Sequence, residues 1–191
     1  MKKLLLLCAL VAGSAYANPV VKLQTNRGDI LLELDEENAP TTVANFLRYV
    51  EDNHYDGTIF HRVIEGFMIQ GGGFDKQLQE KSTREPIANE SHNGLTNNRG
   101  SIAMARTSEP HSATSQFFIN TVDNNFLNKG ERDPYGYAVF GQVIDGMDVV
   151  DAIAATPTKR FARHGNVPTQ PIEIIDAVIV EPSTQTQTTT H

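Results

Sequence analysis

Short runs of apolar residues, bounded by turn-forming residues, recur along most of the chain. Valine, isoleucine, leucine and phenylalanine dominate these runs, and several alternate with polar residues at period two, which is typical of β-strands with one buried face. The first two runs flank the turn sequence at 25–28 and predict an opening hairpin. In chain order we expect strands at 20–23, at 30–34, on the two sides of Gly66 within 60–73, and at 100–106, 115–120, 137–143 and 172–180.

Two segments follow the helical period instead. Residues 40–50 carry apolar side chains at i, i+3, i+4 and i+7 from Val43, and residues 147–154 predict a second, shorter helix. Residues 71–100 and 123–136 are polar and predict long loops. Because many short strands accompany only two helices, without regular alternation of strand and helix, we expect a mainly β fold: a closed antiparallel β-barrel capped by two α-helices.

The two ends of the chain differ from its middle. A basic start, a short apolar run and a final Ala-x-Ala give residues 1–17 the layout of a secretory signal peptide. We therefore expect cleavage after Ala17, one domain over 18–181, and a disordered Thr/Gln-rich tail over 182–191. The only cysteine, Cys8, would leave with the signal, so a hydrophobic core must hold the exported domain together without disulfides.

Charge and motif content narrow the possible functions. The net charge is −7, and it becomes −9 when Lys2 and Lys3 leave with the signal, which argues against a nucleic-acid partner. No basic amphipathic helix indicates a membrane surface as partner. The six histidines fall at no metal-ligand spacing, so we expect no metal. Ser115 lacks the Gly-x-Ser-x-Gly elbow of an acyl-transfer serine.

The stretch 60–73 mixes apolar residues that suit a core with polar groups that a core cannot use. Strand alternation places Met68 and Gln70 on one face, and it places Arg62 on the same face as Phe60. The guanidinium is therefore either paired in the interior or lines an open apolar cleft. The ordinary interpretation, core phenylalanines and an ion-paired arginine, remains open at this point.

A second strand repeats this pattern. In 115–120, the side chains of Gln116, Phe118 and Asn120 share the face opposite to the core. A phenylalanine between two amides indicates a partly apolar binding surface.

Four motifs occur in a fixed order. They are Phe60-His61-Arg62-Val63-Ile64-x-Gly66-Phe67-Met68-x-Gln70-Gly71-Gly72, then Ser101-x-Ala103-Met104-Ala105, then Ser115 to Ile119, then Val139-Phe140-Gly141. Together they resemble the cyclophilin-type peptidyl-prolyl cis-trans isomerases, and the likeness runs from about residue 20 to residue 180. With its signal peptide and Phe74 after the glycines, the chain is most similar to the periplasmic cyclophilins of Gram-negative bacteria. The resemblance implies an eight-stranded barrel, a peptide cleft on its outer face, a monomer and no cofactor.

The resemblance also implies a set of site residues. Arg62 is similar to the catalytic arginine, and Gln70 to the glutamine that helps to place it. The implied substrate-binding residues are Phe67, Met68, Ala105, Arg106, Gln116, Phe118, Phe126, Leu127 and Tyr137.

Three of these positions depart from the best-known eukaryotic members. This chain has Arg106 where those members have asparagine, Phe126 where they have tryptophan, and Tyr137 where they have histidine. The departures bear on peptide preference and drug binding, so we expect only weak binding of cyclosporin.

The function that the resemblance implies is rotation about Xaa-Pro bonds in unfolded or folding exported proteins, in the periplasm. The alternative is a holdase module that captures prolyl segments with little turnover. Both need the same pocket, but an intact Arg62 with Gln70 favours the enzyme.

Overall fold

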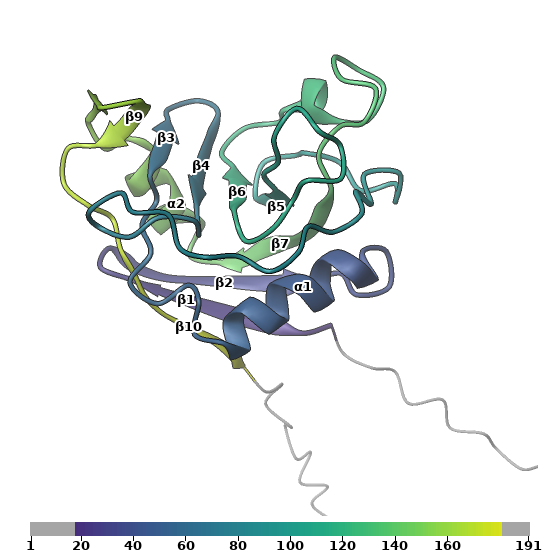
Figure 1. Ribbon diagram of the computed structural model, residues 1–191, viewed down its shortest axis with the longest axis horizontal. Helices are drawn as coiled ribbons and strands as arrows, with labels where there is room; N and C mark the ends of the chain where they lie inside the picture. Colours follow the sequence, from purple (N-terminus) through teal and green to yellow (C-terminus); the bar gives the residue numbers. More distant parts are fainter. Residues whose placement is uncertain (1–17, 181–191) are drawn as a thin grey trace, which may run out of the picture.

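Eight strands form one antiparallel sheet in the computed structural model, which describes residues 18–180 (Figure 1). Their order across the sheet is β10-β1-β2-β7-β5-β6-β4-β3. Each strand matches a segment that the apolar pattern predicts, and the bounds differ by a few residues. The strands are β1 (Val20–Thr25), β2 (Gly28–Leu34), β3 (Arg62–Ile64), β4 (Met68–Gly71), β5 (Ser101–Met104), β6 (Phe117–Asn120), β7 (Val139–Asp145) and β10 (Ile174–Val180).

The sheet is curled but open, so the prediction of a closed barrel is wrong. Its edge strands, β10 and β3, do not pair with each other. Instead, the backbone just before β3 meets the backbone leading into β10: Phe60 N donates to the Ile172 oxygen (2.9 Å) and Ile174 N to the Thr58 oxygen (2.8 Å). These contacts form a single β-bridge, between Ile59 and Glu173, and not a ladder. A few backbone hydrogen bonds, and no continuous ladder, therefore join the two edges; they include Gly57 N to the Ile174 oxygen (2.8 Å).

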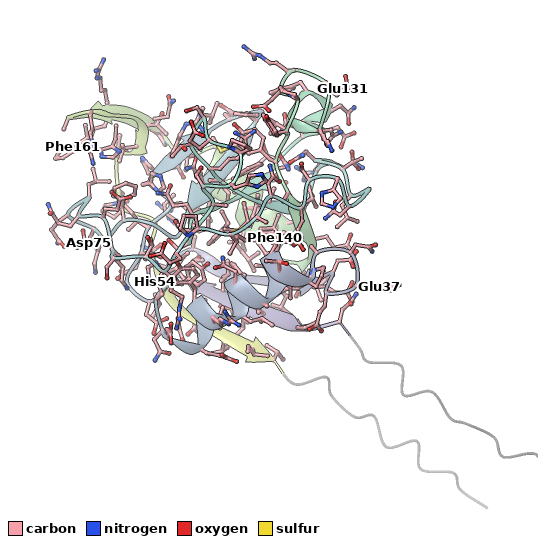
Figure 2. The ribbon with its side chains drawn as sticks, turned by 45° about the vertical axis from the view of Figure 1, so that its right-hand side comes forward. Glu37, His54, Asp75, Glu131, Phe140 and Phe161 are labelled. Atoms are coloured by element: carbon pink, nitrogen blue, oxygen red, sulfur yellow. The ribbon has the colours of Figure 1, made fainter. Side chains whose placement is uncertain are left out.

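Two α-helices cover the core, as predicted. α1 (Pro40–Glu51) begins at a proline, which needs no hydrogen-bond partner in the first turn, and buries one face that includes Phe46. The Phe46 ring packs 5.2 Å from Phe140 and 5.6 Å from Phe117, measured between ring centroids. α2 (Met147–Ala154) is shorter and buries Val150, Ile153 and Ala154. Figure 2 shows Phe140 well inside the molecule.

Side-chain alternation along the strands divides the apolar residues between two clusters. The larger one lies within the curl and contains Phe117 and Ile119, whereas Phe118 belongs to a smaller cluster with Met68, Ala103 and Val139. Phe60 is fully buried in the larger cluster, so the expectation that it shares a face with Arg62 is wrong. The alternation fails because β3 begins only at Arg62.

Some parts of the fold were not predicted. A separate two-stranded sheet, β8 (Thr158–Phe161) and β9 (His164–Pro168), forms a hairpin beside β3, and a 3₁₀ turn covers Asn125–Leu127 (Figure 1). The loop predicted at 71–100 contains no helix and no extended strand beyond Gly71. No helix within residues 18–180 is long and apolar enough to cross a membrane. The proposed signal peptide (1–17) and tail (182–191) lie outside the described residues.

Candidate active site

A cleft of about 480 Å³ opens on the outer face of the sheet, over the smaller apolar cluster. One side is made by β3, β4, β5 and β6, which we call the sheet side, and the other by residues 105–106 and 123–137, which we call the loop side. Every site residue expected from the sequence lines the cleft except Gln116, which contacts a lining residue. The lining residues are Arg62, Phe67, Met68, Gln70, Ala105, Arg106, Phe118, Phe126, Leu127, Arg132, Asp133 and Tyr137.

The floor of the cleft is apolar and follows from strand register. Phe118 on β6 lies opposite Gln70 on β4 and opposite Ala103 on β5, so these side chains share one face of the sheet. Met68 is almost fully buried at 1% exposure, and Phe118 is buried beneath the edge of the Tyr137 ring, 5.7 Å away between centroids. This floor presents an apolar surface at the centre of the cleft.

Phe67 and Phe126 form the apolar mouth. Phe67 precedes β4, so it does not follow the strand alternation that would direct its side chain into the main core. Its ring stacks on that of Phe126 at 5.7 Å, with 23° between the ring planes. Phe126 remains 42% exposed, which leaves an aromatic face open to a ligand.

Arg62 is held by the side-chain amide of Gln70, which is itself held by the amide of Gln116. Arg62 and Gln70 are direct partners across the β3–β4 pair, and the Arg62 Nη1 donates to Gln70 Oε1 at 3.2 Å. Gln70 Nε2 in turn donates to Gln116 Oε1 at 3.0 Å. No carboxylate within residues 18–180 forms an ion pair with Arg62. Burial lowers the pKa of Arg62, while Tyr137 raises it, and a guanidinium stays charged at neutral pH after a modest shift.

The glycines after β4 make room for this relay. A Cβ atom on Gly73 would lie 2.5 Å from Cγ of Gln116, so only glycine lets the Gln116 side chain lie flat toward Gln70. Gly72 has a φ of +83°, which other residues rarely adopt. The absence of side chains at these glycines therefore leaves the space that the Gln116 side chain occupies.

Arg106 lines the other side of the cleft and also has a structural role. Its side chain is only 3% exposed, and its guanidinium turns into the loop side. It donates to the Gly136 oxygen from Nε (3.0 Å) and Nη2 (2.9 Å), and to Asp133 Oδ2 at 2.8 Å. It also lies 4.6 Å from the centre of the Tyr137 ring, as in a cation–π contact. Arg106 therefore fastens the loop that carries the cleft wall.

Asp133 organises the same loop. Besides Arg106, its carboxylate accepts backbone N–H bonds from Tyr135 (2.7 Å) and Gly136 (3.2 Å). Its hydrogen bond to Arg106, together with the backbone donors, holds the pKa of Asp133 below its usual range. Sequence reasoning missed Asp133 and the neighbouring Arg132, which also lines the cleft. Both lie in the polar loop predicted at 123–136, where no apolar periodicity indicates which side chains face the cleft.

A network of asparagines supports the loop side from below. Asn120 Nδ2 donates to Ser101 Oγ (2.8 Å) and to Asn97 Oδ1 (3.2 Å), and Asn124 Nδ2 donates to Asn120 Oδ1 (2.7 Å). Asn124 Nδ2 also reaches the backbone oxygen of Phe67 at 2.9 Å, which links the network to the cleft mouth. Asn120 was expected to share the binding face. It does lie opposite Met68 on β4, as expected, but it is fully buried and its amide is used inside the protein.

Within residues 18–180, no cluster of three or more His, Cys, Asp or Glu side chains could hold a metal ion.

Comparison with known proteins gives the class of this fold and site. The family model described as cyclophilin type peptidyl-prolyl cis-trans isomerase/CLD matches residues 20–179. A peptidyl-prolyl cis-trans isomerase of Acinetobacter baylyi is 58% identical over 170 residues, which cover 89% of this chain and 90% of that protein. Peptidyl-prolyl cis-trans isomerase B of Escherichia coli is 55% identical over 163 residues, which cover 84% and 99% of the two chains.

Solved structures agree with these relatives. A cyclophilin type peptidyl-prolyl cis-trans isomerase of Cryptosporidium parvum superposes with a TM-score of 0.72 at 29% identity, covering 86% of this chain and 99% of that one. The chain described here therefore belongs to the cyclophilin-type peptidyl-prolyl cis-trans isomerases. It is an enzyme of that class.

Proposed function

We propose that this isomerase acts in the periplasm, where it speeds rotation about Xaa-Pro bonds in exported polypeptides and so assists their folding. The observation that carries the catalytic part is Arg62, a cation without a carboxylate partner in the described residues, beside an apolar cleft. The export part rests on the signal-like layout of residues 1–17. A structure of the Cryptosporidium parvum relative was obtained in the presence of the dipeptide Ala-Pro, which supports a prolyl ligand for this cleft.

Arg62 is the catalytic group in this proposal. Rotation about an Xaa-Pro bond breaks amide resonance against a barrier of about 18–20 kcal/mol. In the twisted state the lone pair of the prolyl nitrogen is localised and accepts a hydrogen bond. A guanidinium that donates to this nitrogen stabilises the twisted state more than either planar state, which is the requirement for catalysis. No nucleophile and no proton transfer are needed.

Gln70 and the apolar residues have supporting roles. Gln70 accepts one N–H of Arg62 and fixes the direction of its planar fork, which leaves other N–H donors for the substrate. Phe67, Met68, Phe118 and Leu127 provide an apolar pocket for the proline ring. Because the pocket excludes water, the hydrogen bond from Arg62 to the substrate is stronger than it would be in solvent.

The proposed export and cleavage after Ala17 can be tested by measuring the intact mass of the protein. Expression of the full chain in a Gram-negative host, followed by intact-mass analysis of the periplasmic fraction, is expected to give a protein that starts at Asn18. Recovery of only the full-length chain from the cytoplasm would contradict export and leave the enzyme assignment untouched.

The role in folding is tested with an exported protein whose refolding is limited by a prolyl bond. We expect the mature isomerase to speed the slow refolding phase at substoichiometric concentration, because one enzyme molecule serves many chains. Arg62→Ala is the matched control, since it leaves the apolar cleft in place. If both proteins raised only the refolding yield, at one molecule per client chain, the holdase alternative would replace the proposal.

A further inference from the structure

The β8–β9 hairpin stands apart from the main sheet. It pairs only with itself, and every residue of β8 is exposed. Phe161, at the end of β8, leaves 51% of its surface in solvent, although a phenylalanine ordinarily buries its ring. Figure 2 shows Phe161 at the outer edge of the molecule, above Asp75 and far from Glu131 at the end of the loop side.

The hairpin is basic in an acidic protein. Lys159, Arg160 and Arg163 lie within five consecutive residues, while the whole chain carries a net charge of −7. None of the three takes part in an ion pair within residues 18–180. The two arginines have only local contacts of this kind: Arg160 Nε donates to the Ala162 oxygen at 3.3 Å, and Arg163 Nε lies 3.4 Å from Nε2 of His164. These cations are therefore available to an anionic partner.

An apolar pocket of about 160 Å³ lies at the base of the hairpin. A cavity of about 150 Å³ is enough to hold a benzene ring, so this pocket suits one apolar side chain. Lys76 and Lys159 lie at its rim, although Lys76 is already paired with Glu173 at 2.9 Å. The apolar lining consists of Ile59, Leu78, Phe161, Val167, Pro168 and Pro171.

One wall of this pocket is held in a costly backbone conformation. Leu78 has a φ of +56°, a region that leucine rarely occupies. The loop is fixed there by Asp75, whose Oδ1 accepts the N–H groups of Gln77 and Gln79, both at 2.9 Å. The pocket is therefore built into the fold before any partner arrives.

We propose that the hairpin and its pocket form a second binding site for the substrate polypeptide, selective for a segment that combines an apolar side chain with neighbouring carboxylates. The apolar side chain enters the pocket, and the carboxylates face Lys159, Arg160 and Arg163. This proposal rests on the proposed function, because the bound segment belongs to the same substrate polypeptide whose prolyl bond lies in the cleft.

The two sites lie close enough to act on one chain. Ile59 lines the pocket and Arg62 lines the cleft, and Cα atoms three residues apart are separated by at most about 11 Å. A short linker between the acidic segment and the proline can therefore bridge the sites. Binding at the hairpin then raises the effective concentration of the prolyl bond at Arg62.

A polypeptide fits these features better than other anions. Nucleic acid and anionic lipid surfaces favour a broad basic face, whereas this chain is acidic overall and its cations are confined to one hairpin. Neither of these partners supplies a single apolar side chain for the pocket that Lys159 lines.

The first experiment uses a fluorescein-labelled peptide without proline, Glu-Glu-Leu-Phe-Glu-Glu, and measures its anisotropy with the mature protein. Lys159→Glu is expected to weaken binding at least about tenfold, because it reverses a charge at the pocket rim. Arg48→Glu makes the same charge change on the exposed face of α1 and is expected to have little effect. Phe161→Ala, at an exposed position, is expected to weaken binding by removing an apolar wall. Equal effects of Lys159→Glu and Arg48→Glu would overturn the proposal.

Two further readouts separate this site from the cleft. Arg62→Ala is expected to bind the acidic peptide as the unmodified protein does, and Lys159→Glu is expected to isomerise a short prolyl tetrapeptide normally. Loss of peptide binding in Arg62→Ala would place the peptide in the cleft and contradict the second site. Failure of the unmodified protein to isomerise the tetrapeptide would refute the proposed function. The anisotropy measurement would still show whether the hairpin binds the acidic peptide.

The last experiment joins the two sites. The acidic segment is fused through a Gly-Ser linker to Ala-Ala-Pro-Phe, and the KM of the fusion is compared with that of the free tetrapeptide. We expect the KM of the fusion to be about tenfold lower for the unmodified protein, and equal to that of the tetrapeptide for Lys159→Glu. An unchanged KM for the unmodified protein, or binding of phosphatidylglycerol vesicles that displaces the peptide from the hairpin, would overturn the proposal.

Discussion

Arg62 on the sheet side of the cleft and Arg106 on the loop side are held in opposite ways. Within residues 18–180, the only side chain that forms a hydrogen bond with Arg62 is the neutral amide of Gln70. On the loop side, Arg106 is buried against Asp133 and the Gly136 carbonyl. An arginine that is paired with a carboxylate has its charge compensated within the protein, whereas Arg62 keeps its charge for a ligand. The comparison assigns chemistry to the sheet side and cleft shape to the loop side.

The largest effect is expected at Arg62. We expect Arg62→Ala to lower kcat/KM for a prolyl tetrapeptide about 100- to 1000-fold, because a charge-assisted hydrogen bond in a sheltered site contributes about 3–4 kcal/mol to the barrier. Arg62→Lys is expected to recover little, because an ammonium lacks the planar fork that serves Gln70 and the substrate together. Near-normal activity of the lysine variant would show that charge alone is sufficient.

A smaller and different effect is expected at Arg106. Arg106→Leu removes the contacts that fasten the loop side, so we expect a loss of about 2 kcal/mol of stability after allowance for the partly exposed Asp133. For a domain of this size that loss lowers Tm by about 4–8 °C. The KM for the tetrapeptide should rise while kcat stays within a few-fold. A fall in kcat as large as that of Arg62→Ala would erase the distinction between the two sides.

The pH dependence of stability tests the protonation state of His61, the residue before Arg62 in the chain. His61 is buried beside Phe74, 4.6 Å between ring centroids, and burial lowers its pKa from 6.5 to about 4. Between pH 6.5 and 4 the unfolded chain therefore binds a proton that the folded chain does not, so stability falls as pH is lowered through this window. We expect Tm to drop over that range and His61→Phe to reduce the drop. The same slope in both proteins would contradict a neutral His61.

The smallest effect is expected at the cleft mouth on the loop side. The resemblance places Phe126 where the family members that bind cyclosporin best carry tryptophan, and phenylalanine lacks the indole N–H of that residue. A neutral hydrogen bond contributes about 1 kcal/mol, so Phe126→Trp should improve cyclosporin inhibition about fivefold. Tight inhibition of the unmodified protein would show that the cleft mouth does not control drug binding.

The sheet side could be predicted from the sequence because it is periodic. Met68 and Gln70, two residues apart in one strand, necessarily share a face, and the alternation around Phe118 separates the floor from the main core. The loop side could not be predicted in the same way. Arg106 and Asp133 are 27 residues apart, and Asp133 lies in a segment without period, so their contact depends on the three-dimensional path of the loop.

Two further features escaped prediction for physical reasons. The β8–β9 hairpin has no apolar alternation, since every residue of β8 faces solvent. Closure of the barrel depends on whether the two edges form a ladder, and the few backbone bonds near Ile59 and Glu173 leave no mark in the apolar pattern. Edge contacts of this kind are decided by backbone geometry, not by side-chain type.

The most direct test of the account measures isomerisation rate and Tm on one sample of Arg62→Ala. If Arg62 serves the twisted prolyl bond, the rate falls by two to three orders of magnitude while Tm stays within about 2 °C of the unmodified protein, a shift of less than about 1 kcal/mol. If Arg62 were a structural residue like Arg106, Tm would fall together with the rate. A variant that melts normally and isomerises at nearly the normal rate would refute the catalytic role of Arg62.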